Sequence, residues 1–109
     1  MSKFSLHPKR QEDPEHRKRI RAMECIACRL QGIQQTTPTE GHHIRRRPDG
    51  QSYGWGQKAG DYEMIPLCVE HHWNGTGSIY TRKGFEAEFG DERELLAQTL
   101  RELGMEGAA

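Results

Sequence analysis

The sequence predicts a small α+β domain in which two short strands precede a helix. Its 109 residues suit one domain and no more. Two short segments are predicted to be strands, about residues 41–45, which carry His42-His43, and the apolar run 63–67, whereas capped segments on either side are typical of helices. Leu, Ile, Val and Phe fill 17 of the 109 positions, which is below the ~20% at which disorder is suspected. With so few core residues the fold needs a further source of stability, and a bound metal ion is a candidate.

The N-terminal half is predicted to combine one helix with long loops. Residues 1–12 are charged and aperiodic, so we expect a flexible tail, followed by a single domain over residues 13–109. A helix is predicted from Asp13 and Pro14, an N-cap followed by Pro at the first helical position, to about Met23. Residues 31–41 and 46–61 are rich in Gly, Pro and polar side chains and are predicted to be loops.

The C-terminal half is predicted to be mostly helical. A short helix opens at Cys68, directly after the second strand, and ends in the Gly-containing stretch 74–77. Another spans about Arg82–Phe89. The last starts at Asp91, which forms a capping-box pattern with Glu94, and ends at Gly104. Its apolar stripe is expected to pack into the core and consists of Leu95, Leu96, Leu100 and Leu103.

The zero net charge of the chain conceals an asymmetry between its two halves. Lys+Arg and Asp+Glu each number 16, so the chain lacks the high net charge that accompanies disorder. Residues 1–60 carry 12 basic and 6 acidic side chains, and residues 61–109 carry 4 and 10. The basic half resembles a nucleic-acid footprint, although the two halves would equally well neutralise each other within the fold.

No membrane span or secretion signal is visible. The longest nearly apolar run, Met64–Val69, is six residues long and includes Pro66, far short of the ~20 residues that a membrane helix needs. The basic N-terminus is not followed by an apolar segment. We therefore expect a cytoplasmic chain without contact to a membrane.

Four candidate metal ligands occur as two pairs with the same spacing. Cys25 and Cys28 form a Cys-x2-Cys pair, and Cys68 and His71 form a Cys-x2-His pair after 39 intervening residues. Two such pairs supply the four ligands of a closed tetrahedral zinc site. Zinc would also compensate for the small core, because its binding free energy is folding free energy. The alternatives are a redox-active Cys25–Cys28 pair, which here lacks a βαβ context, and buried cysteines without a metal.

Adjacent histidines occur twice, at His42-His43 and at His71-His72. If His71 faces the zinc, His72 points elsewhere, because neighbouring residues on a helix are about 100° apart. A strand with a histidine pair, a second strand and a helix that begins with histidine together resemble the ββα-metal core of HNH endonucleases. With its Cys-x2-Cys and Ile-Pro-Leu-Cys-x2-His-His segments, the chain is similar to the zinc-containing branch of that superfamily.

A downstream run extends the resemblance to about residues 24–103. It is similar to the phage Ref (recombination enhancement function) type, a RecA-dependent nuclease, in the segments Gly75-Thr76-Gly77-Ser78, Phe85-Glu86, Phe89-Gly90 and Glu94-Leu95-Leu96. The resemblance implies a metal-dependent DNA endonuclease or nickase, with DNA and a RecA-type recombinase filament as partners.

The resemblance also implies a role for each of three histidines. His43 would be the general base that activates a water molecule, and His42 and His72 would bind one divalent cation, Mg2+ or Mn2+. The cation would stabilise charge on the scissile phosphate and the leaving oxygen. Histidine suits the role of the base because its pKa lies near neutral pH.

Three features depart from the family pattern. Glu63 stands where the family has Asn, and the catalytic role is retained if Glu63 accepts the second N–H of His43. The stretch 78–82 has no histidine where many relatives carry a further metal ligand, so that ligand is missing or replaced by water. Finally, His42 and His43 point to opposite faces of a regular strand, so both serve one site only where the strand ends or twists.

Arg45, Arg46 and Arg47 follow the histidine pair directly and are the expected DNA contacts. Three guanidinium groups beside a cleavage centre would neutralise the phosphate backbone and fix its register, whereas the alternative is a solvated charge cluster. Tyr53 and Trp55 would either stack on bases or anchor the loop. The second functional hypothesis is a non-catalytic zinc-ribbon-like module that binds nucleic acid or protein, because such a module requires only the Cys3His set.

Overall fold

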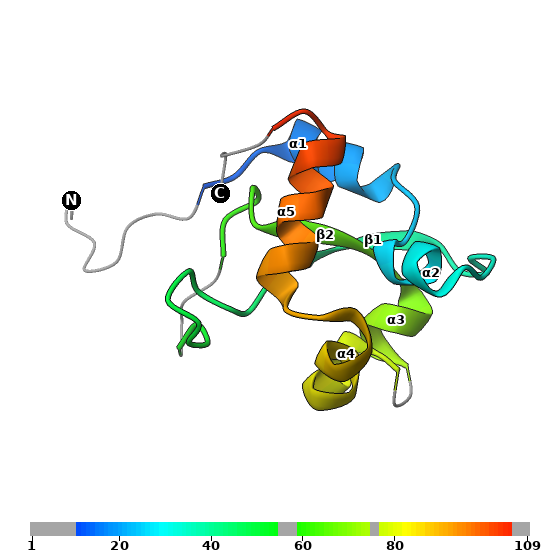
Figure 1. Ribbon diagram of the computed structural model, residues 1–109. Coiled ribbons are helices and arrows are strands. Elements are labelled where there is room, and N and C mark those ends of the chain that lie inside the picture. The colour runs from blue at the N-terminus through cyan, green and yellow to red at the C-terminus, as the bar shows by residue number, and fades with distance from the viewer. Residues whose placement is uncertain (1–10, 55–58, 75–76, 106–109) are drawn as a thin grey trace, which may run out of the picture.

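The computed structural model describes residues 11–54, 59–74 and 77–105, and it has the predicted α+β architecture (Figure 1). Its elements are α1 (Pro14–Arg21), α2 (Ile26–Gln31), β1 (Thr39–His43), β2 (Met64–Cys68), α3 (Val69–Trp73), the 3-10 turn η1 (Ile79–Thr81), α4 (Arg82–Phe89) and α5 (Glu92–Glu102). Among the described residues, no helix has the length and apolar character needed to cross a bilayer.

The two strands form an antiparallel sheet that positions both histidines of β1. The register places His43 opposite Met64 and His42 opposite Ile65. Directly opposed side chains lie on the same face of a sheet, and successive residues alternate between faces. His43 therefore shares one face with Met64, and His42 shares the other face with Ile65.

Gly41 and Pro66 lie opposite each other in this ladder. The N–H of Ile44 donates to the carbonyl of Glu63 at 2.9 Å, and hydrogen-bonded pairs alternate with non-bonded pairs along an antiparallel ladder. By that alternation the Gly41–Pro66 pair is a non-bonded one, so the missing N–H of proline costs no ladder bond. A Cβ at Gly41 would overlap the side chain of Met64, which lies on the same face.

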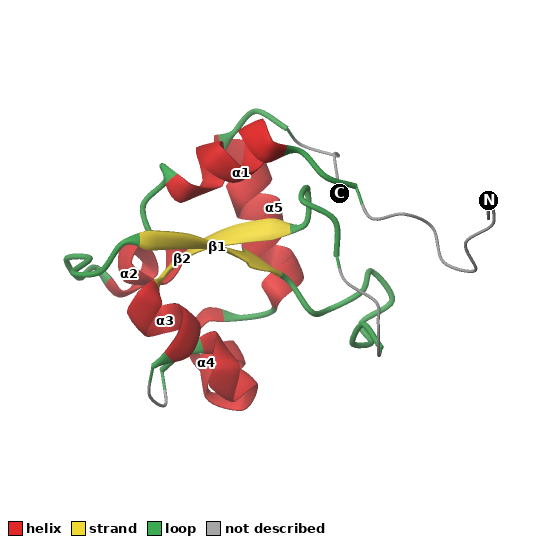
Figure 2. Ribbon diagram, turned by 180° about the vertical axis from the view of Figure 1, so that it is seen from behind, coloured by secondary structure: helices red, strands yellow, loops and turns green. Residues whose placement is uncertain are grey.

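The helices pack around the sheet at three places (Figures 1 and 2). α5 lies across the sheet, α1 contacts both strands, and α2 and α3 meet β2 near Cys68. The chain joins the fold at Gln11, whose carbonyl accepts the N–H of Asp61 at 2.9 Å. The rest of the predicted tail, residues 1–10, lies outside the described residues.

The apolar core is built mainly from β2 and the C-terminal helices. Phe85 of α4 is fully buried, and α5 contributes the buried side chains of Leu95, Leu96 and Leu100. Leu103 was expected to continue this stripe but is only partly buried, because it is the C-cap residue of α5. Gly104 follows with φ +72°, the left-handed conformation expected after a helix end.

The largest differences from the prediction concern α1, β1 and α2. α1 ends at Arg21 and not at Met23, and β1 lies two residues earlier than expected. The helix α2 was not predicted, because six residues are too few to show helical periodicity. Its N-cap is Cys25, whose Sγ accepts the N–H of Cys28 at 3.4 Å, and it ends at Gly32 with φ +69°.

Candidate metal centres and the histidine cluster

Three elements bring the predicted Cys3His set together. Cys25 and Cys28 come from the first turn of α2, Cys68 from the end of β2 and His71 from α3. Their ligand atoms all lie within 4.8 Å of one another. The three Sγ atoms lie 3.3–3.6 Å from Nδ1 of His71, and the Sγ atoms of Cys28 and Cys68 are 3.8 Å apart.

These separations match a tetrahedral metal site. With Zn–S of ~2.3 Å and Zn–N of ~2.0–2.1 Å, tetrahedral angles place two sulfurs about 3.8 Å apart and a sulfur and a nitrogen about 3.6 Å apart. The outer nitrogen of His71, Nε2, lies 3.0 Å from Oε1 of Gln31, whose amide nitrogen donates to Glu88. Gln31 therefore keeps the proton of His71 on Nε2 and leaves Nδ1 to face the cysteines. The cluster can hold a structural metal such as zinc.

The pKa values of Cys25 and Cys28 argue against a redox-active pair. Burial, together with the neighbouring Cys25 and Cys68, raises the pKa of the Cys28 thiol to about 12. Burial also raises the pKa of Cys25. For Cys68, burial acts in the same direction, but hydrogen bonds from the His71 backbone and from Thr37 outweigh it and lower the pKa to about 7. A redox-active Cys-x2-Cys pair needs a thiol of lowered pKa, and here both members have raised values.

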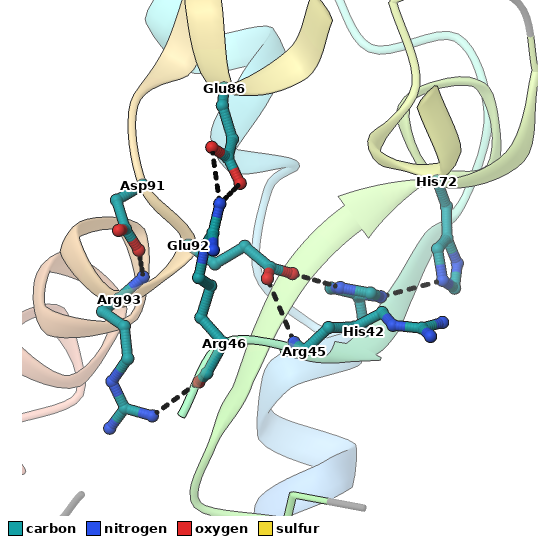
Figure 3. Close-up of polar contacts among 8 residues, drawn as sticks. All are labelled: His42, Arg45, Arg46, His72, Glu86, Asp91, Glu92 and Arg93. Atoms are coloured by element: carbon teal, nitrogen blue, oxygen red, sulfur yellow. Dashed lines mark hydrogen bonds and ion pairs between the residues drawn. The ribbon is translucent and has the colours of Figure 1, made fainter. Parts of the chain in front are cut away.

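A second cluster joins His42 of β1 to His72 of α3 (Figure 3). Nδ1 of His42 lies 3.3 Å from Nε2 of His72. The other nitrogen of His42, Nε2, lies 2.8 Å from Oε2 of Glu92, which is 1% exposed. The other nitrogen of His72, Nδ1, lies 2.8 Å from Oε1 of Glu40.

The two carboxylates determine where the histidine lone pairs point. Ionised carboxylates only accept hydrogen bonds, so each neutral ring carries its proton on the side of its glutamate. The lone pairs of His42 Nδ1 and His72 Nε2 then face each other. Two nitrogens bound to one tetrahedral zinc ion at ~2.0–2.1 Å lie about 3.3 Å apart, which is the observed separation. Carboxylate-supported histidines of this kind are typical of metal ligands.

Burial keeps His72 in the neutral form that binds cations. It is the main cause that lowers the pKa of His72, and the nearby His42 adds to it against the opposing effect of Glu40. Among the described residues, only the Cys3His set forms a group of three or more metal-binding side chains. The His42–His72 pair would supply only two ligands to a cation. The stretch 78–82, where a further ligand was in question, contains η1 (Ile79–Thr81) with the exposed Tyr80, and its last residue begins α4.

His43 lies on the other face of the sheet and contacts Asp61, which is completely buried. Nε2 of His43 lies 2.8 Å from Oδ1 of Asp61, while Oδ2 accepts the N–H of Asp13 and a guanidinium N–H of Arg17, both at 2.6 Å. Burial alone would raise the pKa of Asp61, but these hydrogen bonds outweigh it and lower the pKa. The ionised carboxylate holds the proton of His43 on Nε2 and leaves Nδ1 as the basic nitrogen.

Glu63 does not take the position predicted for it. Its carboxylate accepts the hydroxyl of Tyr53 at 2.6 Å and the guanidinium of Arg93. The reason is the alternation of the strand, because Met64 shares a face with His43 and Glu63 therefore points to the opposite face. The carboxylate that orients His43 is that of Asp61, which the sequence interpretation missed.

The three arginines after β1 have different environments. Arg45 is exposed, its backbone N–H donates to Glu92 at 3.0 Å, and its side chain extends past His42 on the side of His72 in Figure 3. Arg46 forms two hydrogen bonds to Glu86, at 2.8 and 3.0 Å. Arg47 lies 3.2 Å from Asp49 in a largely exposed ion pair. Arg45 is therefore the member best placed to reach a phosphate group.

Of the two loop aromatics, Tyr53 anchors the loop. Its hydroxyl contacts Glu63, its ring packs on the core, and its N–H donates to the carbonyl of Arg45 at 2.9 Å. Trp55 lies outside the described residues. Comparison of the chain with protein-family models, with curated proteins and with solved structures finds no match, so the candidate sites are interpreted from their own geometry.

Proposed function

We propose that the protein is a metal-dependent DNA endonuclease or nickase of HNH type, with structural zinc at the Cys3His cluster. In this proposal β1, β2 and α3 form the ββα-metal core. The observation that supports it most is the pair of ring nitrogens of His42 and His72, 3.3 Å apart, with the opposite nitrogen of each ring held by a glutamate. Two histidines whose carboxylate-bonded nitrogens point away from each other favour a cation between them.

The residues of the pair would bind Mg2+ or Mn2+, and the open positions would take substrate oxygens. The cation would supply Lewis-acid stabilisation of charge on the scissile phosphate and the leaving oxygen. His43 would act as the general base, since Asp61 fixes its tautomer so that Nδ1 accepts a proton from the attacking water. Asp61 thus orients the base in the way that a buried aspartate orients the histidine of a catalytic triad.

The strand geometry is compatible with these two roles. In an in-line displacement, the nucleophile and the leaving oxygen lie on opposite sides of the phosphorus atom. His42 and His43 are consecutive residues at the end of β1, and their side chains leave the strand on opposite faces. For both residues to serve one phosphate, the phosphate has to bind beyond the end of the strand, where it would have the base on one side and the cation ligands on the other.

The proposed substrate is DNA, with Arg45 as its nearest backbone contact. A guanidinium beside the cleavage centre would pair with a phosphate and fix its position. A RecA-type filament as the partner is proposed from the likeness to Ref-type nucleases alone. For this reason, both bare DNA and DNA coated with RecA have to be assayed.

The proposal is tested with His43→Ala. Nicking of supercoiled plasmid is measured with Mn2+ and with Mg2+, on bare DNA and on DNA that contains a RecA-coated single strand. We expect the parent to cut at least one of these substrates and His43→Ala to cut neither. Zinc content and circular dichroism of the variant should match those of the parent, because Asp61 and not His43 makes the contacts to α1. An alanine variant that cuts as fast as the parent would falsify the assignment.

The Cys3His cluster alone supports the second candidate, a non-catalytic zinc module that binds nucleic acid or protein. Such a module requires one tightly bound zinc and gives no role to His42, His43 or His72. Metal counting separates the candidates. One zinc per chain, no binding of Mn2+ at millimolar concentration and no cleavage of either substrate would favour the module.

A further inference from the structure

Three aromatic rings form a ladder that starts at the proposed cation site and ends in solvent. The rings of His72 and Trp73 have centroids 4.1 Å apart and are tilted by 32°. Those of Trp73 and Tyr80 are 5.9 Å apart and tilted by 46°. Exposure rises along the ladder, since Trp73 is 52% exposed and Tyr80 is 73% exposed.

The ladder is held in place by the carboxylate that supports the histidine. Oε1 of Glu40 accepts the indole N–H of Trp73 at 2.9 Å and also lies 2.8 Å from Nδ1 of His72. The Trp73 ring is therefore fixed relative to the His42–His72 pair. A ligand that stacks on the outer rings would have a defined position relative to a cation bound by these histidines.

The surroundings of the outer rings differ from those of a protein-docking surface. The exposed positions nearby in the sequence, within or beside α3 and η1, are polar or glycine: Glu70, Asn74, Gly77 and Thr81. Docking patches for proteins are usually continuous apolar areas of several hundred Å2. Two exposed planar rings in a polar setting can stack on nucleobases, because every base offers an aromatic face.

We propose that Trp73 and Tyr80 bind an unpaired nucleobase next to the phosphate at the His42–His72 pair, so that single-stranded or locally unpaired DNA is the preferred substrate. The inference rests on the proposed nuclease function. Bases inside a duplex are covered on both faces by their neighbours, whereas an unpaired base has a face to offer. Stacking does not depend on sequence, so the ladder selects DNA structure and not a base.

The test measures binding to the zinc-loaded full chain without Mn2+ or Mg2+, so that no cleavage is required. The probes are a labelled 12-nucleotide oligo(dT), an abasic strand of the same length and a duplex. Tyr80→Ala should weaken binding of oligo(dT) about tenfold by anisotropy and leave duplex binding unchanged. Tyr80→Phe, which keeps the ring, should bind like the parent. Ile33→Ala is the matched control, because Ile33 is an exposed apolar residue outside the ladder (53%).

Tryptophan fluorescence gives a second readout, which reports stacking on Trp73 directly and does not depend on the affinity of the variant. In a Trp55→Phe background, Trp73 is the only tryptophan. Oligo(dT) should quench its emission, and the abasic strand, which has the same phosphates, should not. Equal quenching by both strands, or an equal loss of single-strand and duplex affinity in Tyr80→Ala, would contradict the proposal that Trp73 and Tyr80 stack on an unpaired base. If the parent quenches with oligo(dT) as expected but cuts none of the DNA substrates in the nicking assay, the nuclease proposal is contradicted and the stacking proposal is not. The two failures are therefore distinguishable.

Discussion

Nε2 of His43 lies 2.8 Å from Oδ1 of the fully buried Asp61, and the second oxygen of this carboxylate accepts N–H groups of Asp13 and Arg17 in α1. A residue in the loop before β2 thus connects the proposed base to the N-terminal helix. The orientation of the His43 ring depends on the docking of α1, although α1 lies outside the part of the chain that resembles HNH nucleases.

The first prediction separates Asp61 from Glu63. Asp61→Asn should lower the rate of Mn2+-dependent nicking by about 100-fold. The neutral amide lacks the negative charge that holds the proton of His43 on Nε2 and stabilises the ring once Nδ1 has accepted a proton. Glu63→Gln should cut DNA at a rate close to that of the parent, since Glu63 contacts Tyr53 and Arg93. Initial rates on supercoiled plasmid provide the comparison. The result that contradicts the assignment is a Glu63→Gln enzyme as slow as Asp61→Asn.

The sequence predicts the metal ligands better than the groups that orient them. The x2 spacing of Cys25–Cys28 and Cys68–His71 is local, and a tight turn or a helix start places both members of each pair on one ion. Period-2 alternation also predicts that His42 and His43 face apart. These conclusions depend on neighbouring residues only, which is why the structure agrees with them.

The supporting carboxylates could not be found in this way. Glu92 lies 50 residues after His42 in the sequence, and Glu40 lies 32 before His72, so only the packing of α5 and α3 on the sheet brings them together. The strand alternation at Glu63 could have excluded Glu63 as the group that orients His43, but only once the pairing of the two strands was known. The ladder register of β1 and β2 directs it away from His43, but the register itself depends on tertiary structure.

The second prediction concerns the carboxylate behind His42. Glu92→Gln should weaken Mn2+ binding by about 10- to 100-fold, because it removes the charge that fixes the His42 tautomer and raises its basicity. The matched control is Glu94→Gln, an exposed residue in the same turn of α5. Titration of Mn2+ by electron paramagnetic resonance gives both dissociation constants. Equal affinities for the two variants would show that Glu92 does not support a cation ligand.

The third prediction concerns the Cys3His cluster. His71→Ala should lose zinc and the cooperative unfolding transition, since structural zinc contributes about 10–16 kcal/mol, as much as the whole stability of a small domain. His71→Cys should keep both, because four thiolates also form a tetrahedral zinc site. Elemental analysis gives the zinc content of the two variants, and thermal unfolding followed by circular dichroism shows whether each has a cooperative transition. A folded, zinc-free His71→Ala protein would show that the core suffices without the metal.

The fourth prediction distinguishes two adjacent arginines. Arg45→Ala should weaken DNA binding and reduce the slope of log K against log salt by about one, with unfolding unchanged, because one phosphate contact is lost. Arg46→Ala should lower the unfolding midpoint and leave the salt slope unchanged, because Arg46 is bonded to Glu86 and to the carbonyl of Gly50. Binding titrations at several salt concentrations provide the slopes. Equal slopes for the two variants would contradict this division of roles.

The fifth prediction concerns pH and the buried His16 of α1. Neither ring nitrogen of His16 has a hydrogen-bond partner among the described residues, and its ring lies 5.0 Å from that of Tyr62. Burial lowers its pKa below the usual 6.5, assisted by Arg19 and opposed by Asp13 and Asp61. The unfolded chain therefore binds more protons than the folded one between the two pKa values, and stability falls as the pH drops below 6.5 toward the folded value.

His16→Phe removes this titration while keeping an aromatic ring against Tyr62. The difference in the free energy of unfolding between His16→Phe and the parent should widen as the pH falls from 7.5 to 5. In the parent, His16 becomes protonated more readily in the unfolded chain than in the folded one, and this stabilises the unfolded state. The variant lacks this titrating group. At neutral pH the variant should already be about 1–2 kcal/mol more stable, since two unsatisfied buried nitrogens are gone. Zinc release at acid pH affects both proteins and cancels in the difference. Urea unfolding at each pH gives the two curves, and parallel curves would mean that His16 does not titrate on unfolding.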